Sequence, residues 1–151
     1  MSDLLRLIEI VLRHPIHIPI VHFPIALSYF AVLAAALAIL MGWRHNPSMR
    51  SFFSQVLFFD TGLLIFGVIA AMATGIYENQ TRYNGLAPNT HLKIIFGSLL
   101  LFIAVVLTLW RWRSPELMSG RAAFLVLGLS AAGAGLATAL GFLGGIIVWG
   151  T

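Results

Sequence analysis

The chain has 151 residues, of which 60% are hydrophobic and 9% are charged. A soluble domain carries about 25% charged residues, so this composition excludes a soluble globular protein and places the chain in a lipid bilayer. The absence of cysteine excludes disulfides, thiolate metal sites, cysteine-bound iron–sulfur clusters and covalently attached haem. The net charge of +4 does not indicate a nucleic-acid partner, because the basic residues stand at the ends of apolar runs, where they anchor to lipid headgroups.

Residues 2–13 have the pattern of a short amphipathic helix. Charged residues recur every three or four positions and form one polar stripe, while leucine, isoleucine and valine face away from it. This pattern is typical of a helix that lies in the membrane interface. A basic start and a small-residue cleavage site are both missing, so we do not expect a cleaved signal peptide.

A segment rich in histidine and proline follows at residues 14–24. It holds three of the five histidines and three of the six prolines. Proline fixes φ and lacks a backbone N–H, so Pro15 and Pro19 are expected to keep the segment out of a regular helix. Pro24 is expected to open a helix, because proline is tolerated in a first turn. The segment is predicted to be an irregular, imidazole-rich cap on a membrane helix.

Four apolar runs complete the chain, each long enough to cross about 30 Å of hydrocarbon. They cover roughly residues 24–43, 52–77, 91–110 and 122–149. A backbone in hydrocarbon must satisfy its own hydrogen bonds, so each run is predicted to be a helix. Short loops with turn residues connect them. For residues 1–151 we therefore predict one all-α domain, an integral membrane four-helix bundle with a short N-terminal interfacial helix.

The basic residues orient this bundle. One side carries Arg44, Arg50, Arg111, Arg113 and Arg121. The other side carries Arg6, Arg13, Arg82 and Lys93, diluted by Asp3, Glu9 and Glu78. The positive-inside rule then places both termini outside.

The predicted topology brings residues that are distant in sequence to one face of the membrane. The histidine-rich segment precedes the first run, Glu78 closes the second, His91 opens the third, and Gly141, Gly144 and Gly145 close the fourth. Four imidazoles, a carboxylate and a run of glycines are therefore expected in one layer.

Several of these motifs resemble those of the domain of unknown function 2231 family of bacterial membrane proteins. Residues 14–27, from His14-Pro15 to Ala26-Leu27, are similar to its opening signature. Thr74-Gly75 with Tyr77-Glu78, His91, and Gly141 to Gly145 with Trp149 are similar to its later motifs. The resemblance covers nearly the whole chain and implies a bacterial inner-membrane protein, whose termini are then periplasmic. Related domains occur fused to Rieske-type or cytochrome-type modules, which implies a redox setting.

His22 and His91 are the predicted axial ligands of a b-type haem. Each stands at or just before the start of a membrane helix, and the two helices run in the same direction, so the imidazoles lie at similar depth. Such a haem needs two imidazoles that face each other across the iron. The positive end of a helix dipole disfavours imidazolium, which leaves these histidines neutral and able to bind.

The surroundings of the predicted haem follow from the same layer. Gly75, Gly97 and Gly144 are expected to make room for the macrocycle, and Arg82, Lys93 or Arg13 to pair with its propionates. Glu78, His14 and His17 are expected as outer groups, with Glu78 orienting a ligand imidazole through its second nitrogen.

A bare metal ion is the alternative occupant of the same residues. His14, His17, His22, His91 and Glu78 offer nitrogen and oxygen ligands that suit zinc, copper or iron.

Asp60 is the only acidic residue well inside a predicted span, roughly 12 Å along its helix at 1.5 Å per residue. Intramembrane carboxylates are costly and often functional, so one interpretation is a proton-linked or quinone-linked role. The other is structural: a protonated acid, or one bonded to Arg44, Arg50 or a hydroxyl.

The leading functional hypothesis is a membrane electron-transfer subunit that carries one haem b near the outer, periplasmic face and has no catalytic residues of its own. Its partners would be other redox-protein subunits, a periplasmic electron carrier or a quinol. The second hypothesis is a membrane metal-ion-binding protein. The third is a structural subunit of a larger respiratory or photosynthetic complex, docking through glycine-rich faces such as Gly141 to Gly145.

Overall fold

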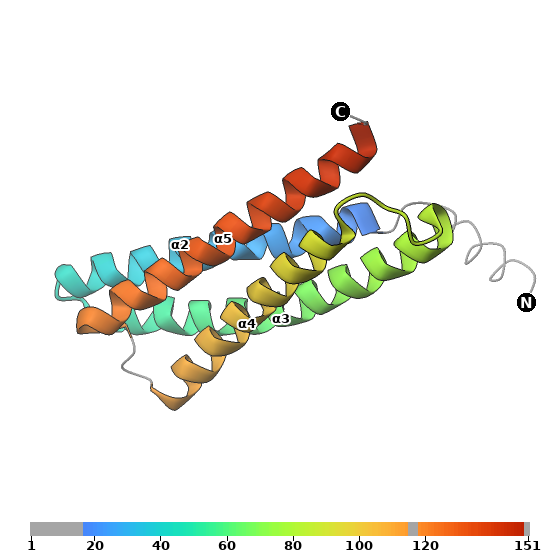
Figure 1. The fold of residues 1–151 in the computed structure, drawn as a ribbon. Coiled ribbons are helices and arrows are strands. Elements are labelled where there is room, and N and C mark those ends of the chain that lie inside the picture. Colours follow the sequence, from blue (N-terminus) through green and yellow to red (C-terminus); the bar gives the residue numbers. More distant parts are fainter. Residues whose placement is uncertain (1–16, 115–117, 150–151) are drawn as a thin grey trace, which may run out of the picture.

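The computed structural model describes residues 17–114 and 118–149, which form four α-helices (Figure 1). They are α2 (His17–Trp43), α3 (Pro47–Tyr83), α4 (Thr90–Arg113) and α5 (Gly120–Trp149). All four are long and apolar enough to cross a membrane. The prediction of an all-α protein with four membrane spans is thereby confirmed. The predicted interfacial helix at residues 2–13 and the candidate ligand His14 lie outside the described residues.

The first membrane helix begins earlier than predicted. Helix α2 is continuous from His17 through Pro24, so the expectation of an irregular backbone up to Pro24 is wrong. Pro19 lies in the first turn, where a backbone N–H would have no intrahelical acceptor in any case. Pro24 lies inside the helix, and the hydroxyl of Ser28 donates a hydrogen bond to its carbonyl at 2.7 Å. His17 and His22 are therefore both presented by regular helix.

Helix α3, with 37 residues, extends beyond the predicted apolar run at both ends. Its start is capped by Asn46, whose side-chain oxygen accepts a hydrogen bond from the N–H of Met49 at 3.1 Å. Its end is marked by Asn84 in the left-handed conformation, followed by Gly85 with φ of 82°. At 1.5 Å per residue the helix is about 55 Å long, which exceeds the hydrocarbon thickness. Its last turns, which include Glu78 and Arg82, therefore project toward the membrane surface.

Consecutive helices run in opposite directions, and each packs against two neighbours around the bundle (Figure 1). Helix α2 contacts α3 and α5, and α4 contacts the same two. One end of the bundle, here called the arginine end, carries Arg44, Arg50, Arg111, Arg113 and Arg121. The other, here called the histidine end, holds the starts of α2 and α4 and the ends of α3 and α5.

The interior contains two apolar clusters. The cluster toward the arginine end is built on alanines of α2 with larger side chains from the other helices: Ala31, Ala34, Ala35, Ala38, Leu57, Leu107 and Val126. The cluster toward the histidine end consists of Leu64, Val68, Leu100, Ala104 and Ala137. Beyond this second cluster the helices no longer fill the space between them.

Candidate functional site: a cavity at the histidine end

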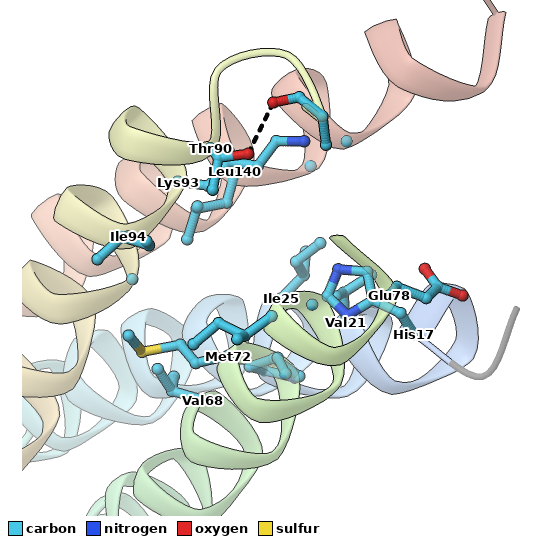
Figure 2. A pocket seen from close by; sticks show the side chains of 18 of the residues that line it. His17, Val21, Ile25, Val68, Met72, Glu78, Thr90, Lys93, Ile94 and Leu140 are labelled. Atoms are coloured by element: carbon cyan, nitrogen blue, oxygen red, sulfur yellow. Dashed lines mark hydrogen bonds between the residues drawn. The ribbon is translucent and has the colours of Figure 1, made fainter. Parts of the chain in front are cut away.

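A cavity of about 480 Å³ lies at the histidine end, and all four helices line it (Figure 2). Most of its wall is apolar and includes Val21, Ile25, Val68, Met72, Ile94 and Leu140. The hydroxyl of Thr90 donates a hydrogen bond to the carbonyl of Ala87 at 2.7 Å and fixes the start of α4 beside it (Figure 2). Sites for small molecules and cofactors typically enclose about 300–1,000 Å³ with mostly apolar walls. The cavity therefore has the size and lining of a ligand site.

The cavity brings together most of the site residues predicted from the sequence. Its lining includes His17 and His22 from α2, Gly75 and Glu78 from α3, Gly97 from α4 and Gly144 from α5. His91, in the first turn of α4, is exposed and is not among the lining residues. The structure thus gathers His17 and His22 at one wall and leaves His91 outside.

His17 is held in one orientation by Thr74. Its Nδ1 lies 3.0 Å from the hydroxyl oxygen of Thr74. That hydroxyl lies 2.8 Å from the carbonyl of Ala70, to which it can donate its single proton. With the hydroxyl proton directed to this carbonyl, the oxygen accepts from His17 and the imidazole proton lies on Nδ1. The other nitrogen, Nε2, keeps its lone pair, which is the form in which imidazole binds a metal.

Gly75 provides the space that His17 occupies. A Cβ atom at position 75 would lie 2.9 Å from Cε1 of His17, closer than such atoms approach one another. Sequence reasoning assigned this glycine to cofactor clearance, whereas its observed contact is with the imidazole. Gly97 has a similar relation to Met72, because a Cβ there would lie 3.3 Å from the Met72 sulfur.

Charged side chains surround His17 at the cavity wall. Burial lowers the pKa of His17 below its usual 6.5, the positive charge of Lys93 acts in the same direction, and Glu78 opposes both. The imidazole is consequently neutral at physiological pH. Glu78 forms an ion pair with Arg82 along α3, with Oε1 3.6 Å from Nε. An otherwise apolar cavity therefore carries two cations, Lys93 and Arg82, which suits an apolar ligand with anionic substituents.

Thr74 is a residue of this site to which the sequence alone assigns no role. In the sequence it is only part of the Thr74-Gly75 motif. The signal in the sequence for such a role is a hydroxyl next to a glycine, near the end of a helix that is expected to end beside the imidazoles. Which imidazole it would meet depended on where α2 begins.

A bare metal site is not apparent in residues 17–114 and 118–149. No group of three histidine, aspartate or glutamate side chains among them lies close enough to hold a metal ion. A metal-ion site of the predicted kind would need His14, which lies outside this part of the chain.

Asp60 lies apart from the cavity, in the interior of the bundle. Its side chain is 4% exposed, and within the described residues neither carboxyl oxygen has a hydrogen-bond partner. The predicted bond to Arg44, Arg50 or a hydroxyl is therefore absent from this part of the chain.

Comparison with known proteins supports the membrane assignment. Residues 13–151 match the family model described as "Predicted membrane protein (DUF2231)". Comparisons with curated proteins and with solved structures found no match. The match spans nearly the whole chain and agrees with the four candidate membrane helices. The chain is a multi-pass integral membrane protein and belongs to the DUF2231 family.

Proposed function

We propose that this protein is a membrane electron-transfer subunit that binds one b-type haem in the cavity at the histidine end. The observation that carries the proposal is the state of His17. Its Nδ1 lies 3.0 Å from the hydroxyl oxygen of Thr74, which can accept the Nδ1 proton and so leave the Nε2 lone pair available at the wall of an apolar cavity. Metal-binding histidines commonly have their second ring nitrogen fixed in this way. A b-type haem would supply one-electron transfer.

The cavity wall fits the other parts of such a group. Its apolar side chains suit a hydrophobic macrocycle, and its volume of about 480 Å³ lies in the range of cofactor sites. Lys93 and Arg82 line it from two different helices, and cationic side chains form strong charge-assisted hydrogen bonds with carboxylates such as propionates. Gly144 leaves open space at the wall of α5, where an added Cβ would meet nothing within 4 Å, whereas the space beside Gly97 is taken by Met72.

His17 is the iron ligand that the contacts support best. The sequence favoured His22 and His91 as the axial pair and treated His17 as an alternative. His22 lines the cavity from the same helix and the same wall as His17 and is exposed, so it cannot face His17 across one iron, and His91 lies outside the cavity. The contacts therefore support one protein ligand, His17. The pair of His22 and His91 stays a prediction that substitution can decide.

The arginine distribution supports a location for this site. Five arginines stand at the end opposite the cavity, so the positive-inside rule puts the cavity near the periplasmic face of a bacterial inner membrane with both termini outside. Electrons would then be exchanged with a quinol in the bilayer, a periplasmic carrier or a neighbouring redox subunit.

A reduced-minus-oxidised spectrum of the purified full-length protein tests the proposal. We expect a b-type α-band and about one haem per chain, with a low-spin spectrum if two side chains bind the iron. Absence of the band, together with no spectral change on adding haemin, would overturn it. In that case stoichiometric zinc, copper or iron would indicate the metal-ion protein, and co-purifying subunits without a cofactor would indicate the structural one.

A further inference from the structure

Two buried polar side chains inside the bundle lack hydrogen-bond partners among the described residues. Asp60 on α3 is 4% exposed and Ser130 on α5 is 2% exposed. Both carboxyl oxygens of Asp60 and the hydroxyl oxygen of Ser130 are without a partner there. Neither residue lines the cavity, so neither belongs to the proposed haem site.

These two residues lie on helices that do not contact each other, because α3 and α5 each pack against α2 and α4. Thr108 of α4 donates a hydrogen bond to Thr61, the neighbour of Asp60, at 2.9 Å. Further along, α4 meets α5 where Leu100 lies against Gly133. Because α4 and α5 run in opposite directions, this register puts the level of Asp60 nearer the start of α5, roughly one to two turns before Ser130. Both side chains are buried, so both belong to the interior of the bundle.

The side of Asp60 that faces α2 is lined by small apolar residues. Helices α2 and α3 meet where His17 contacts Gly75 and where Phe23 contacts Gly67. The same register brings Asp60 level with Ala31, which is buried and belongs to the alanine cluster. At this level helix α2 therefore offers no charge, and its buried hydroxyl, Ser28, already donates to the carbonyl of Pro24.

The remaining neighbours of Asp60 do not neutralise it. The hydroxyl of Thr108 is already shared between Thr61 and the carbonyl of Ala104. Arg111, the charged residue that reaches into this half of the bundle from α4, donates from Nε to the hydroxyl of Ser54 at 2.6 Å. Helix α5 does not contact α3, and its buried Ser130 is uncharged. Within the described residues no ion pair involves Asp60.

An ionised carboxylate in such a place is costly, because the bilayer interior supplies neither water nor a counter-ion. Two occupants can neutralise it, a proton or a metal cation. A cation such as sodium needs several oxygen ligands, whereas a proton needs one carboxyl oxygen. The alanine wall and the neighbouring hydroxyls of Thr61 and Thr108, which are engaged in other hydrogen bonds, favour the proton.

We propose that Asp60 is a proton-binding site inside the membrane that exchanges its proton with the arginine end. Release converts the carboxylic acid to a carboxylate and a free proton. Toward the arginine end, Ser54 and Arg111 make the interior more polar, and the Ser54 hydroxyl can both accept and donate a proton. Toward the cavity, the cluster of Leu64, Val68 and Leu100 separates Asp60 from the haem site. This role is independent of whether the cavity binds haem.

Labelling with dicyclohexylcarbodiimide tests the proposal on the full-length protein in detergent. The O–H group of an undissociated carboxylic acid adds across a C=N bond of this apolar reagent, with the oxygen bonding to carbon and the proton to nitrogen. The reagent therefore reports protonated carboxyls in apolar surroundings. We expect a mass adduct on the peptide that contains Asp60 at neutral pH, a progressive loss of the adduct as the pH rises, and no effect of sodium. The water-soluble carbodiimide, as a matched control, should leave Asp60 unlabelled.

Infrared spectroscopy provides a second measurement that does not depend on reagent access. The wild type should show the carbonyl-stretch band of a protonated carboxyl in an apolar site, and Asp60→Asn should lose it while keeping the helical amide bands. Absence of both the adduct and the band at neutral pH would overturn the proposal. Protection of Asp60 from labelling by sodium would also overturn it and would identify a cation site instead.

Discussion

The histidine end and the arginine end are built from the same four helices but are packed differently. At the arginine end, α2 contributes Ala31, Ala34, Ala35 and Ala38, each at most 2% exposed, and the helices close around them. At the histidine end the same helix contributes His17 and His22, and the helices enclose about 480 Å³. The size and polarity of the side chains on one helix therefore decide where the bundle is solid and where it is hollow.

The polar side chains of the two ends also have different hydrogen-bond partners. Toward the arginine end, hydroxyls are used within the bundle, as in the bonds from Arg111 to Ser54 and from Thr108 to Thr61. At the histidine end, Thr74 fixes one nitrogen of His17 and leaves the other able to bind. Substitutions at the first end should therefore act on stability, and those at the second on ligand binding.

The largest expected effect on stability is at the arginine end, for Ala35→Leu. Ala35 is 0% exposed, so a larger side chain must displace neighbouring helices. Overpacking of this kind costs about 1–3 kcal/mol, which should appear as a lower midpoint of thermal unfolding in detergent. The matched control is Ala36→Leu on the same helix, which is exposed and should be close to neutral. Equal losses in both variants would contradict the closed packing described here.

A smaller effect on stability, but a large one on binding, is expected for Gly75→Ala. The new Cβ would lie 2.9 Å from Cε1 of His17 and must displace the imidazole. Alanine in place of a helical glycine gains up to about 1 kcal/mol in propensity, which offsets part of the strain. Haem content per chain should fall well below that of the wild type.

Gly62→Ala is the control for this substitution, because it lies on the same helix and a Cβ there meets nothing within 4 Å. It should retain full haem content and gain stability. If both variants bind haem equally, Gly75 does not act through His17.

The smallest expected effect is a pH dependence of stability. Burial lowers the pKa of His17 in the folded protein below 6.5, so the unfolded chain binds more protons in the interval between the two values. The contribution of neutral His17 to stability is therefore fully present above pH 6.5, the pKa of the unfolded chain. It is lost as the pH falls from there toward the lower pKa of the folded protein. As the pH is lowered across this interval, the midpoint of thermal unfolding should decline more steeply in the wild type than in His17→Gln. Parallel profiles would show that His17 is not the titrating group.

The four spans could be predicted from the sequence because hydrocarbon thickness and backbone hydrogen bonding leave few alternatives. The start of α2 could not be predicted in this way, because proline usually indicates a break in a helix. Pro19 instead occupies the first turn of α2, where proline is tolerated. Starting the helix at His17 changes which imidazole stands at its first turn.

His91 shows a second limit of the sequence argument. It does lie in the first turn of α4, as its position before an apolar run suggested, yet its side chain is exposed. The rotation of a helix about its own axis is set by packing against its neighbours, here Gly97 against Met72. Length and hydropathy do not specify that rotation, so the layer could be predicted but the facing pairs within it could not.

Haem content in purified His17→Ala and His91→Ala, measured beside the wild type, tests the central claim most directly. Because His17 lines the cavity with one nitrogen fixed by Thr74 and His91 is exposed outside it, His17→Ala should lose the b-type band. His91→Ala should retain the band with unchanged amplitude and spin state. Loss of the band in His91→Ala, with an unchanged spectrum in His17→Ala, would contradict the account and place the haem outside the cavity.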